Sequence, residues 1–390
     1  MIYFDNAATT FPKPDAVYNE VIRCMTEYCG NPGRGSHKLS IAASNKIYEC
    51  RCQIAEFFHS DNPENVVFTY NTTYALNLAI KTLLSPDSHV IYSDIEHNAV
   101  YRPICALETY GIKHNSFKTY ESEMIPNYDF NQMILKSIRS SIRPDTRVLI
   151  ASHCSNICGI RLPLEKIGNI CREFGIIFIV DAAQSAGFYD IDMKKCNIAA
   201  LCVPGHKGLY GIQGCGFTIY SPEYNRPEFL KNNTFIEGGS GINSLDIEMP
   251  DMLPEHFEAG TLSTPAIAGL CEGIKYIKNI GTEEIQSREY KLYRRVKEIL
   301  MNTKGITLYA NDLRESNIIL FNIEGKSPNA VAESLDNERI CVRSGFHCSP
   351  LAHKLLGTGD NGAVRISFGM FNTMSEIDEF YRALRGTVAF

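Results

Sequence analysis

Short apolar runs alternate with segments of helical periodicity between about Val66 and Tyr220. A filled apolar run is typical of a buried strand, whereas apolar residues spaced by three and four are typical of a helix with one buried face. The predicted elements are strands at 66–70, 89–92 and 146–151, and helices at 73–84, after 98 and from 163. This alternation predicts a mostly parallel sheet flanked by helices, the α/β class.

The segment 163–181 shows how one such unit is encoded. Pro163 suits a first helical turn, and Gly175 is placed to end the helix. One apolar face would consist of Leu164, Ile167, Ile170, Cys171 and Phe174. The strand 176–180 follows and leads into Asp181. Because ligands of such sheets bind beyond the carboxyl ends of the strands, Asp181 marks a predicted ligand site.

The pattern changes after about Thr264. A long helical stretch is followed by predicted strands at 316–323, 339–343 and 363–368, with a helix near 329–336, a loop before the last strand, and a final helix capped by Ser375. Fewer strands without regular alternation predict a smaller α+β domain at the C-terminal end.

Composition limits the class of protein further. The chain has 390 residues, 44% of them apolar and 21% charged, which is typical of a globular protein large enough for two domains. A net charge of −6 with mixed signs argues against nucleic acid or an anionic membrane as a partner, and favours a small-molecule substrate. No apolar run has the length of a membrane span and the N-terminus lacks a signal pattern, so we expect a cytoplasmic protein.

The 14 cysteines are scattered through apolar segments, so most are expected to be reduced and buried. Three groups have residue types that bind zinc: Cys50 with Cys52; His153 with Cys154 and Cys158; and His347 with Cys348 and His353. None has the paired spacing of a structural zinc site, and no metal is expected.

A lysine with unusual surroundings follows the apolar run 199–203. Lys207 lies in PGHKGLYG, directly after a predicted buried strand, where partial desolvation would lower the pKa of its amine and allow attack on an aldehyde. Alone, the segment is more typical of a surface lysine in a glycine-rich turn. Asp181 and Gln184 end the preceding strand, where a carboxylate can keep a pyridine nitrogen protonated and an amide can bond a phenolate, as pyridoxal phosphate (PLP) requires.

Two further strand ends carry polar residues. Thr72 and Thr73 open a helix after the first strand, where backbone N–H groups and a hydroxyl would hold a phosphate; Thr72 as a plain helix cap is the alternative. His97 follows the strand 89–92, where an imidazole can stack on a flat ring and move protons, although a lone loop histidine is more often structural.

Ten segments in order resemble one family, the class V, fold-type I PLP enzymes, and within it the cysteine desulfurases and selenocysteine lyases. They are YFDNAATT, NPGRGSH, NTTYALN, EHNAV, SHCSNICG, VDAAQSAG, GHKGLYG, FEAGTLSTP, RSGFHCSPLAHK and VRISFGMFNT. The resemblance implies a fold-type I PLP-transferase with a mostly parallel seven-stranded sheet. It implies a large domain at 16–264 and a small domain made of 1–15 and 265–390.

The resemblance also implies residue roles. Lys207 would carry PLP, Asp181 would pair with the pyridine nitrogen, and Gln184 would meet the phenolate. His97 would stack on the ring and take part in catalysis. The remaining implied positions are phosphate ligands at Thr72, Thr73 and His206; Gly260 and Thr261, reaching the phosphate of the neighbouring subunit of a homodimer; and substrate-binding residues at Ala8, Asn156 and Arg365, with Asn156 also near the cofactor. An arginine suits a substrate carboxylate because its fork binds in two places.

The chain departs from the family pattern in two places. Pro204 stands where members usually have a serine or threonine phosphate ligand, and it offers neither hydroxyl nor N–H. Gly33 stands where many desulfurases have histidine. Phosphate binding and the natural sulfur acceptor are therefore the least determined features.

Cys348 is the predicted nucleophile. It lies in a loop between two predicted strands, it is the cysteine that the pattern marks as exposed, and His347 and Arg343 nearby would favour its thiolate. We expect a sulfurtransferase that converts L-cysteine to L-alanine and leaves a persulfide on Cys348 for an acceptor. The alternatives are a selenocysteine lyase and a C–S β-lyase that releases pyruvate and sulfide. A nicotinamide oxidoreductase lacks its glycine motif here, and a non-catalytic sulfur carrier would not need Lys207.

Overall fold

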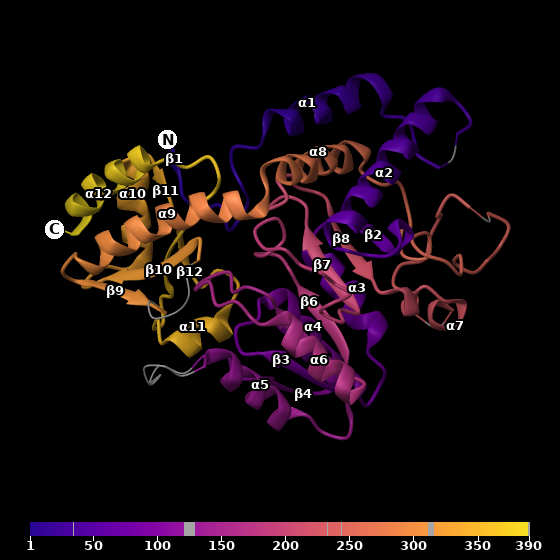
Figure 1. The fold of residues 1–390 in the computed structure, drawn as a ribbon, viewed down its shortest axis with the longest axis horizontal. Coiled ribbons are helices and arrows are strands. Elements are labelled where there is room, and N and C mark those ends of the chain that lie inside the picture. Colours follow the sequence, from indigo (N-terminus) through magenta and orange to yellow (C-terminus); the bar gives the residue numbers. More distant parts are fainter. Residues whose placement is uncertain (34, 121–128, 232, 243, 311–315, 389–390) are drawn as a thin grey trace.

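A seven-stranded sheet forms the centre of the computed structural model, which describes residues 1–33, 35–120, 129–231, 233–242, 244–310 and 316–388 (Figure 1). Its order is β2-β8-β7-β6-β5-β3-β4; β8 is antiparallel to both neighbours and the other pairs are parallel. The strands are β2 (Val66–Thr69), β3 (His89–Ser93), β4 (Lys113–Phe117), β5 (Thr146–Ser152), β6 (Ile177–Asp181), β7 (Ala200–Pro204) and β8 (Gly216–Tyr220). The predicted mostly parallel α/β sheet is confirmed.

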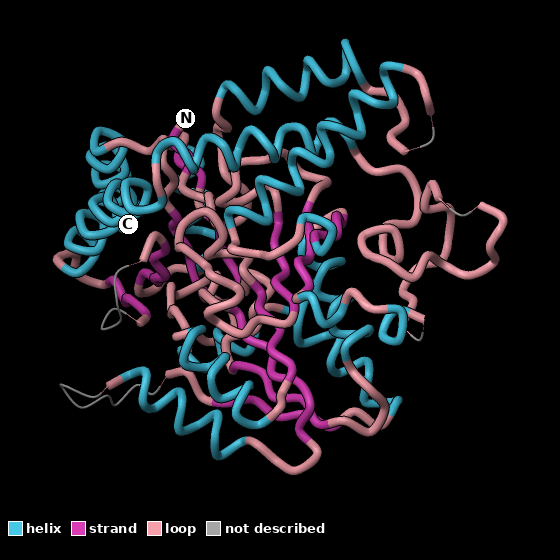
Figure 2. Tube along the Cα trace, turned by 45° about the vertical axis from the view of Figure 1, so that its right-hand side comes forward, coloured by secondary structure: helices cyan, strands magenta, loops and turns pink. Residues whose placement is uncertain are grey.

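Helices cover both faces of this sheet (Figure 2). Side chains alternate between the faces, so Leu149 of β5 belongs to one core cluster and Val148 to the other. The helices around this sheet are α1 (Asp15–Arg23), α2 (Lys38–Phe57), α3 (Thr72–Leu83), α4 (Asn98–Ala106), α5 (Phe130–Ser141), α6 (Leu164–Phe174), the short α7 (Pro227–Leu230) and α8 (Thr264–Ile280). Burial on both faces explains the continuous apolar runs of the sequence. None of the helices described is long and apolar enough to cross a bilayer.

A smaller antiparallel sheet, of order β12-β13-β10-β9, lies beside the large one. Its elements are β9 (Ile306–Tyr309), β10 (Ile318–Ile323), β12 (Arg343–Gly345), β13 (Ala363–Ser367), and helices α9 (Thr282–Met301), α10 (Pro328–Asn337), α11 (Pro350–Leu356) and α12 (Met374–Val388). The N-terminal strand β1 (Ile2–Tyr3) pairs in parallel with β11 (Ile340–Cys341), and Phe4 joins the core of this region. The exact division at residue 264 stays a prediction, since α8 packs against α1 and α2.

Three helix boundaries differ from the sequence-based prediction. The last helix begins at Met374, and its cap is Thr373, whose hydroxyl accepts from the Glu376 amide while the Glu376 carboxylate accepts from the Thr373 amide. The cap of α3 is Asn71, not Thr72, because the Asn71 side chain accepts from the Tyr74 amide. The long helical stretch is divided at Gly281 (φ 87°), so that α8 and α9 are separate helices.

The region around Cys348 also differs from its prediction. The strand expected at 339–343 is divided into β11 and β12, and the expected loop before β13 contains the helix α11. Its short apolar face, with Leu351 and Ala352, was too brief to stand out in the sequence. Cys348 lies in the turn between β12 and α11.

A buried ion pair fastens α2 to the segment that follows the large sheet. Arg51 donates from Nη2 to Oε2 of Glu258 (2.5 Å), and its Nη1 donates to the carbonyl of Val66. The other oxygen of Glu258 accepts from the amide of Phe68 at 2.6 Å. Both side chains are 7% exposed, so each charge depends on the other for compensation.

Replacing Arg51 with methionine is expected to lower the free energy of unfolding by about 3–5 kcal/mol, because the Glu258 carboxylate stays buried without its cation. Arg139→Met is the matched control: it breaks an exposed pair with Glu173 (2.6 Å) and is expected to cost less than about 1 kcal/mol. Thermal unfolding followed by circular dichroism measures both. Equal shifts for the two variants would contradict a stabilising role for the buried pair.

Candidate active site

Residues from five strand ends meet at one edge of the large sheet. They enclose a cavity with about 540 Å³ of empty space, part of it open to solvent. The lining residues are Asn71, Thr72, Thr73, His97, Ala99, Ser152, Cys154, Asn156, Asp181, Ala183, Gln184, Pro204, His206 and Lys207. Eight residues predicted as site residues from the sequence are therefore neighbours in space: Thr72, Thr73, His97, Asn156, Asp181, Gln184, His206 and Lys207.

Lys207 is partly buried in the wall of this cavity. Desolvation lowers the pKa of its amine to about 8; the charge of Arg365 acts in the same direction, and the carboxylate of Asp181 opposes it. A larger fraction of the amine is then neutral near pH 7 than for an ordinary lysine. A neutral amine is the form that attacks an aldehyde.

Asp181 and Gln184 lie after β6, as the sequence predicts. Asp181 is almost fully buried; desolvation raises the pKa of its carboxyl, while a hydrogen bond from the Ala183 amide (2.8 Å) and the charge of Lys207 oppose that rise. The amide nitrogen of Gln184 donates to the carbonyl of Ala7 at 2.9 Å. This contact ties the N-terminal segment to the edge of the site.

His97 caps α4. Its Nδ1 accepts from the amide of Ala99 at 3.0 Å, which leaves the ring proton on Nε2. Burial, assisted by the charge of Lys207, lowers the pKa of the imidazole to about 4, so the ring is neutral at neutral pH. Just before it, the buried Glu96 accepts hydrogen bonds from the amide (2.7 Å) and hydroxyl (2.6 Å) of Ser152. These bonds hold the loop of His97 against the end of β5.

The part of the cavity lined by Thr72, Thr73 and His206 suits an anion. The buried hydroxyl of Thr72 has no hydrogen-bond partner among the described residues. Because Asn71 caps only the amide of Tyr74, the first amides of α3, including that of Thr73, face the open end of the helix. His206 lies on the same wall, with Nδ1 3.1 Å from the hydroxyl of Thr9. Pro204 ends β7 and lines the cavity without a donor.

Arg365, Ala8 and Cys348 are not among the residues that line the cavity. Arg365 is 2% exposed and donates to Oδ1 of Asp5 (2.6 Å) and to the carbonyl of Asn156 (3.0 Å). Its buried Nε has no partner within the described chain. Ala8 donates its amide to the carbonyl of Asp5 at 3.0 Å. Arg365 is thus held against the backbone of Asn156, and its Nε–H is unpaired within the described chain.

Cys348 is exposed, as predicted, although Cys29 is exposed as well. The carbonyl of Cys348 accepts from the amide of Asn98 at 2.8 Å, which places the turn on the first residue of α4, next to His97. Burial lowers the pKa of His347 to about 3, so its ring is neutral and does not favour the thiolate through a positive charge. Arg343 remains as a nearby cation.

Both polar atoms of the Asn156 side chain form hydrogen bonds with the turn that contains Cys348. Its amide nitrogen donates to the carbonyl of His347 (2.8 Å), and its oxygen accepts from the hydroxyl of Ser349 (2.6 Å). Asn156 therefore connects the Cys348 turn, the cavity and, through its own carbonyl, Arg365.

Gly260 and Thr261 lie away from Lys207. They line a separate, open cavity next to Arg51 and Glu258. Neither residue is among those that line the Lys207 cavity. Of the NPGRGSH segment that shares this cavity, Arg34 lies outside the described residues.

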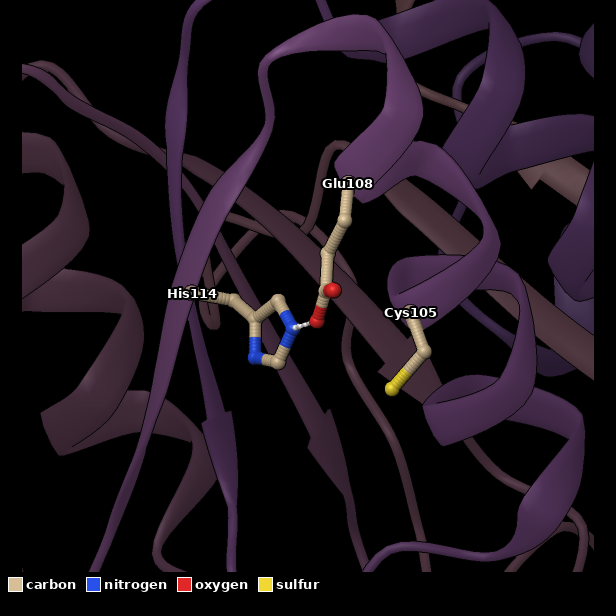
Figure 3. A group of neighbouring side chains, drawn as sticks. All are labelled: Cys105, Glu108 and His114. Atoms are coloured by element: carbon tan, nitrogen blue, oxygen red, sulfur yellow. Dashed lines mark hydrogen bonds and ion pairs between the residues drawn. The ribbon is translucent and has the colours of Figure 1, made fainter.

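The three groups weighed for zinc do not recur among the clusters of metal-binding residue types in the described chain. The structure brings together Cys105, Glu108 and His114, and separately Glu49, Cys271 and Glu272. In Figure 3 the ring of His114 faces Glu108, and their Nε2 and Oε1 atoms are 2.6 Å apart. A hydrogen bond thus accounts for the closest contact in the first cluster.

Lys13 was missed by sequence reasoning. Its buried ammonium donates to the carbonyl of His206 (2.6 Å) and to the hydroxyl of Thr10 (2.7 Å). The same carbonyl accepts from the hydroxyl of Thr9 (3.1 Å). Donors of the N-terminal segment therefore converge on the peptide that precedes Lys207. Nothing in the local pattern FPKP signals this contact, which joins residues far apart in the chain.

Comparison with known proteins gives a family for this arrangement. The class-V aminotransferase family model matches residues 2–380. The chain belongs to this family. A protein of Pyrococcus abyssi named "Probable cysteine desulfurase" is 33% identical, with 100% of this chain and 94% of that protein covered; a protein of the same name from Methanothermobacter thermautotrophicus is 31% identical over 96% and 92%.

Solved structures agree with this class-V assignment. The apo structure of a cysteine desulfurase from Thermococcus onnurineus NA1 has a TM-score of 0.87 at 30% identity, covering 100% of this chain and 94% of that one. A cysteine desulfurase of Escherichia coli has a TM-score of 0.85 at 22% identity, covering 99% and 94%, and supports the fold alone. The predicted family and fold are confirmed.

The buried Lys13 gives this class-V protein a specific pH dependence of stability. Burial lowers the pKa of Lys13 to about 7, so between pH 7 and pH 10 the unfolded chain binds the proton that the folded chain has lost. This residue therefore makes stability rise with pH in that window, by at most about 1.4 kcal/mol per pH unit. We expect the melting temperature of the wild type to increase relative to that of Lys13→Met from pH 7 to pH 9.

Lys195→Met is the control, because Lys195 is exposed and paired with Glu165. The difference in melting temperature between Lys195→Met and the wild type is expected to stay constant from pH 7 to pH 9. A constant difference for Lys13→Met as well would show that the ammonium does not lose its proton on folding.

Proposed function

We propose that this class-V family member is a PLP-dependent cysteine desulfurase. It would convert L-cysteine to L-alanine and leave a persulfide on Cys348 for transfer to an acceptor. The observation that carries the proposal is the position of an exposed cysteine on the first residue of α4, beside His97 and the Lys207 cavity. The names of the most similar relatives support the same activity.

The residues present fit PLP. Lys207 offers the amine for its aldehyde, Asp181 a buried carboxylate for its pyridine nitrogen, and Gln184 an amide for its phenolate. The unpartnered hydroxyl of Thr72, with Thr73 and His206, suits its phosphate. When bound, PLP supplies an electron sink for the carbon next to the substrate amine.

The substrate would be held by its carboxylate. Arg365 keeps its guanidinium in place through Asp5 and the Asn156 carbonyl, and its buried Nε is free to donate. A carboxylate is the partner that such a buried N–H favours. His97 holds a proton on Nε2 at the wall of the cavity, and Lys207, with a pKa of about 8, can release or accept a proton near neutral pH.

Cys348 would then act on the substrate sulfur. Its thiolate forms a sulfur–sulfur bond while the sulfur–carbon bond of cysteine breaks. The electron pair of the broken bond stays on carbon and takes up one proton, which gives alanine. The transferred sulfur remains as a persulfide on Cys348, exposed for an acceptor thiol.

The same proposal includes a homodimer. Gly260 and Thr261 line an open cavity away from Lys207, where they would serve the phosphate of a second copy. The neighbouring loop exposes Leu245 (100%) and Ile247 (103%), apolar side chains that a second subunit would cover. We also propose that the protein acts in the cytoplasm, where reducing conditions would keep the exposed thiol of Cys348 free to react.

Lys207→Ala is expected to abolish the visible absorption of the bound cofactor and all activity, because the amine that attacks the aldehyde is removed. Absorption spectra and borohydride labelling with peptide mapping measure this. Lys195→Ala, an exposed lysine, is the control and is expected to keep the wild-type spectrum. Borohydride labelling of another lysine in the wild type would disprove the assignment.

Cys348→Ala is expected to retain PLP and to bind cysteine, but to form no persulfide. Its rate of alanine production is expected to fall at least about 100-fold. Alanine, pyruvate, sulfide and persulfide are measured after incubation with cysteine, and Cys29→Ala, the other exposed thiol, is the control. Wild-type alanine production would exclude Cys348 as the nucleophile. Pyruvate with sulfide would instead indicate a β-lyase, and activity confined to selenocysteine would indicate a selenocysteine lyase.

A further inference from the structure

Two histidines lie edge to edge behind the Cys348 turn. The rings of His347 and His353 are 5.3 Å apart and inclined by only 10°. Their facing nitrogens, Nδ1 of His347 and Nε2 of His353, are 3.1 Å apart. His353 belongs to α11 and is 2% exposed, so helix and turn are joined by a contact sheltered from water.

The partners at each end fix the protons in this pair. Nε2 of His347 lies 3.3 Å from the carbonyl of Arg343, which can only accept, so Nε2 carries the proton and Nδ1 is an acceptor. Nε2 of His353 must then donate to it. Nδ1 of His353 is left to accept from the hydroxyl of Thr358 at 2.8 Å. The result is one directed chain from Thr358 through His353 and His347 to Arg343.

The directed chain requires both rings to be neutral. A second proton on His347 would set its Nδ1–H against the Nε2–H of His353, and a second proton on His353 would reverse the direction of its bond with the Thr358 hydroxyl. Burial, with the charge of Arg365 acting in the same direction on both, lowers the pKa of His347 to about 3 and of His353 to about 4. Arg343 adds to the effect at His347. Arg365 is itself paired with the carboxylate of Asp5.

The turn that the pair supports has an unfavourable backbone. His347 (φ 50°) and Cys348 (φ 57°) are consecutive non-glycine residues in the left-handed region. Each such residue costs roughly 1 kcal/mol or more and persists only where surrounding contacts enforce it. The carbonyls of both residues are held, by Asn156 and by the Asn98 amide, and the ring of His347 is held by His353.

We propose that His353 is a positioning residue that acts through His347 to hold Cys348 in its left-handed turn on α4. His353 touches neither the cavity nor the thiol in the contacts described; its influence passes through one nitrogen-to-nitrogen hydrogen bond. The proposal rests on the proposed role of Cys348 for its kinetic consequence, but not for its structural one.

The test compares two substitutions in the holoenzyme. His353→Phe keeps a flat ring and removes the donor, whereas His353→Gln is the matched control because its amide N–H can replace the donor. Hydrogen exchange of the segment 343–358 and of the Asn98 amide is expected to be about five- to tenfold faster in His353→Phe, as for the loss of one hydrogen bond, and close to wild type in His353→Gln. The segment Ile318–Ile323 of β10 is the internal reference and is expected not to change.

Kinetics with cysteine give the second measurement. His353→Phe is expected to lower kcat for alanine production roughly ten- to 100-fold, because the nucleophile is misplaced, with KM within about twofold of wild type. His353→Gln is expected to restore kcat. Unchanged hydrogen exchange in His353→Phe, or a higher KM with an unchanged kcat, would overturn the proposal. Faster exchange without any desulfuration by the wild type would leave the positioning role standing and reject the proposed reaction.

If His353→Phe does not fold, Thr358→Val tests the same hydrogen-bonded chain. It removes the hydroxyl that fixes the tautomer of His353, so the ring can turn its acceptor toward His347 and weaken the contact. A smaller acceleration of exchange in 343–358 is then expected. Wild-type exchange in this variant would count against the directed chain.

Discussion

Burial of both faces of the parallel sheet is the constraint on which the rest of this molecule depends. With α2, α5, α6 and α8 on one face and α3 and α4 on the other, both faces are filled with apolar side chains, and the polar residues of the site lie at the edge where the parallel strands end. Asp181, His97 and Lys207 come from different loops at that edge and share one cavity. The site therefore forms at the carboxyl ends of the strands, beyond the apolar layers that cover the two faces of the sheet.

The site is held from the small region as much as from the large one. Phe4 belongs to the core around β10 and β13, while a few residues later Thr10 and Lys13 bind the carbonyl of His206, which precedes Lys207. Arg365 of β13 reaches across to the carbonyl of Asn156. A disturbance of either region would therefore reach the amine, the carboxylate-binding group and the nucleophile together.

The sequence predicted those features that depend on interactions between residues close together in the chain. The strand that leads to Asp181, the helix ended by Gly175 and the lysine after β7 follow from apolar runs and turn residues, and each lies where expected. The contacts of Lys13 and His353 could not be predicted, because their partners are set by packing between distant segments. The helix α11 was missed for a related reason: seven residues carry too little periodicity to be recognised. The roles of Gly260 and Thr261 depend on a second subunit and stay predictions.

The pairing of β1 with β11 has a consequence for the order of events during synthesis. Ile2 lies directly opposite Ile340, and its side chain and that of Phe4 are buried with residues from 292 to 384. A ribosome exposes residue 2 long before residue 340 exists, so the start of the chain has no native partner for most of translation. The large sheet can assemble in that interval, whereas the segment that braces Lys207 must wait for almost the whole chain. Residues 2–4 are thus made well before their partners and reach their native contacts late.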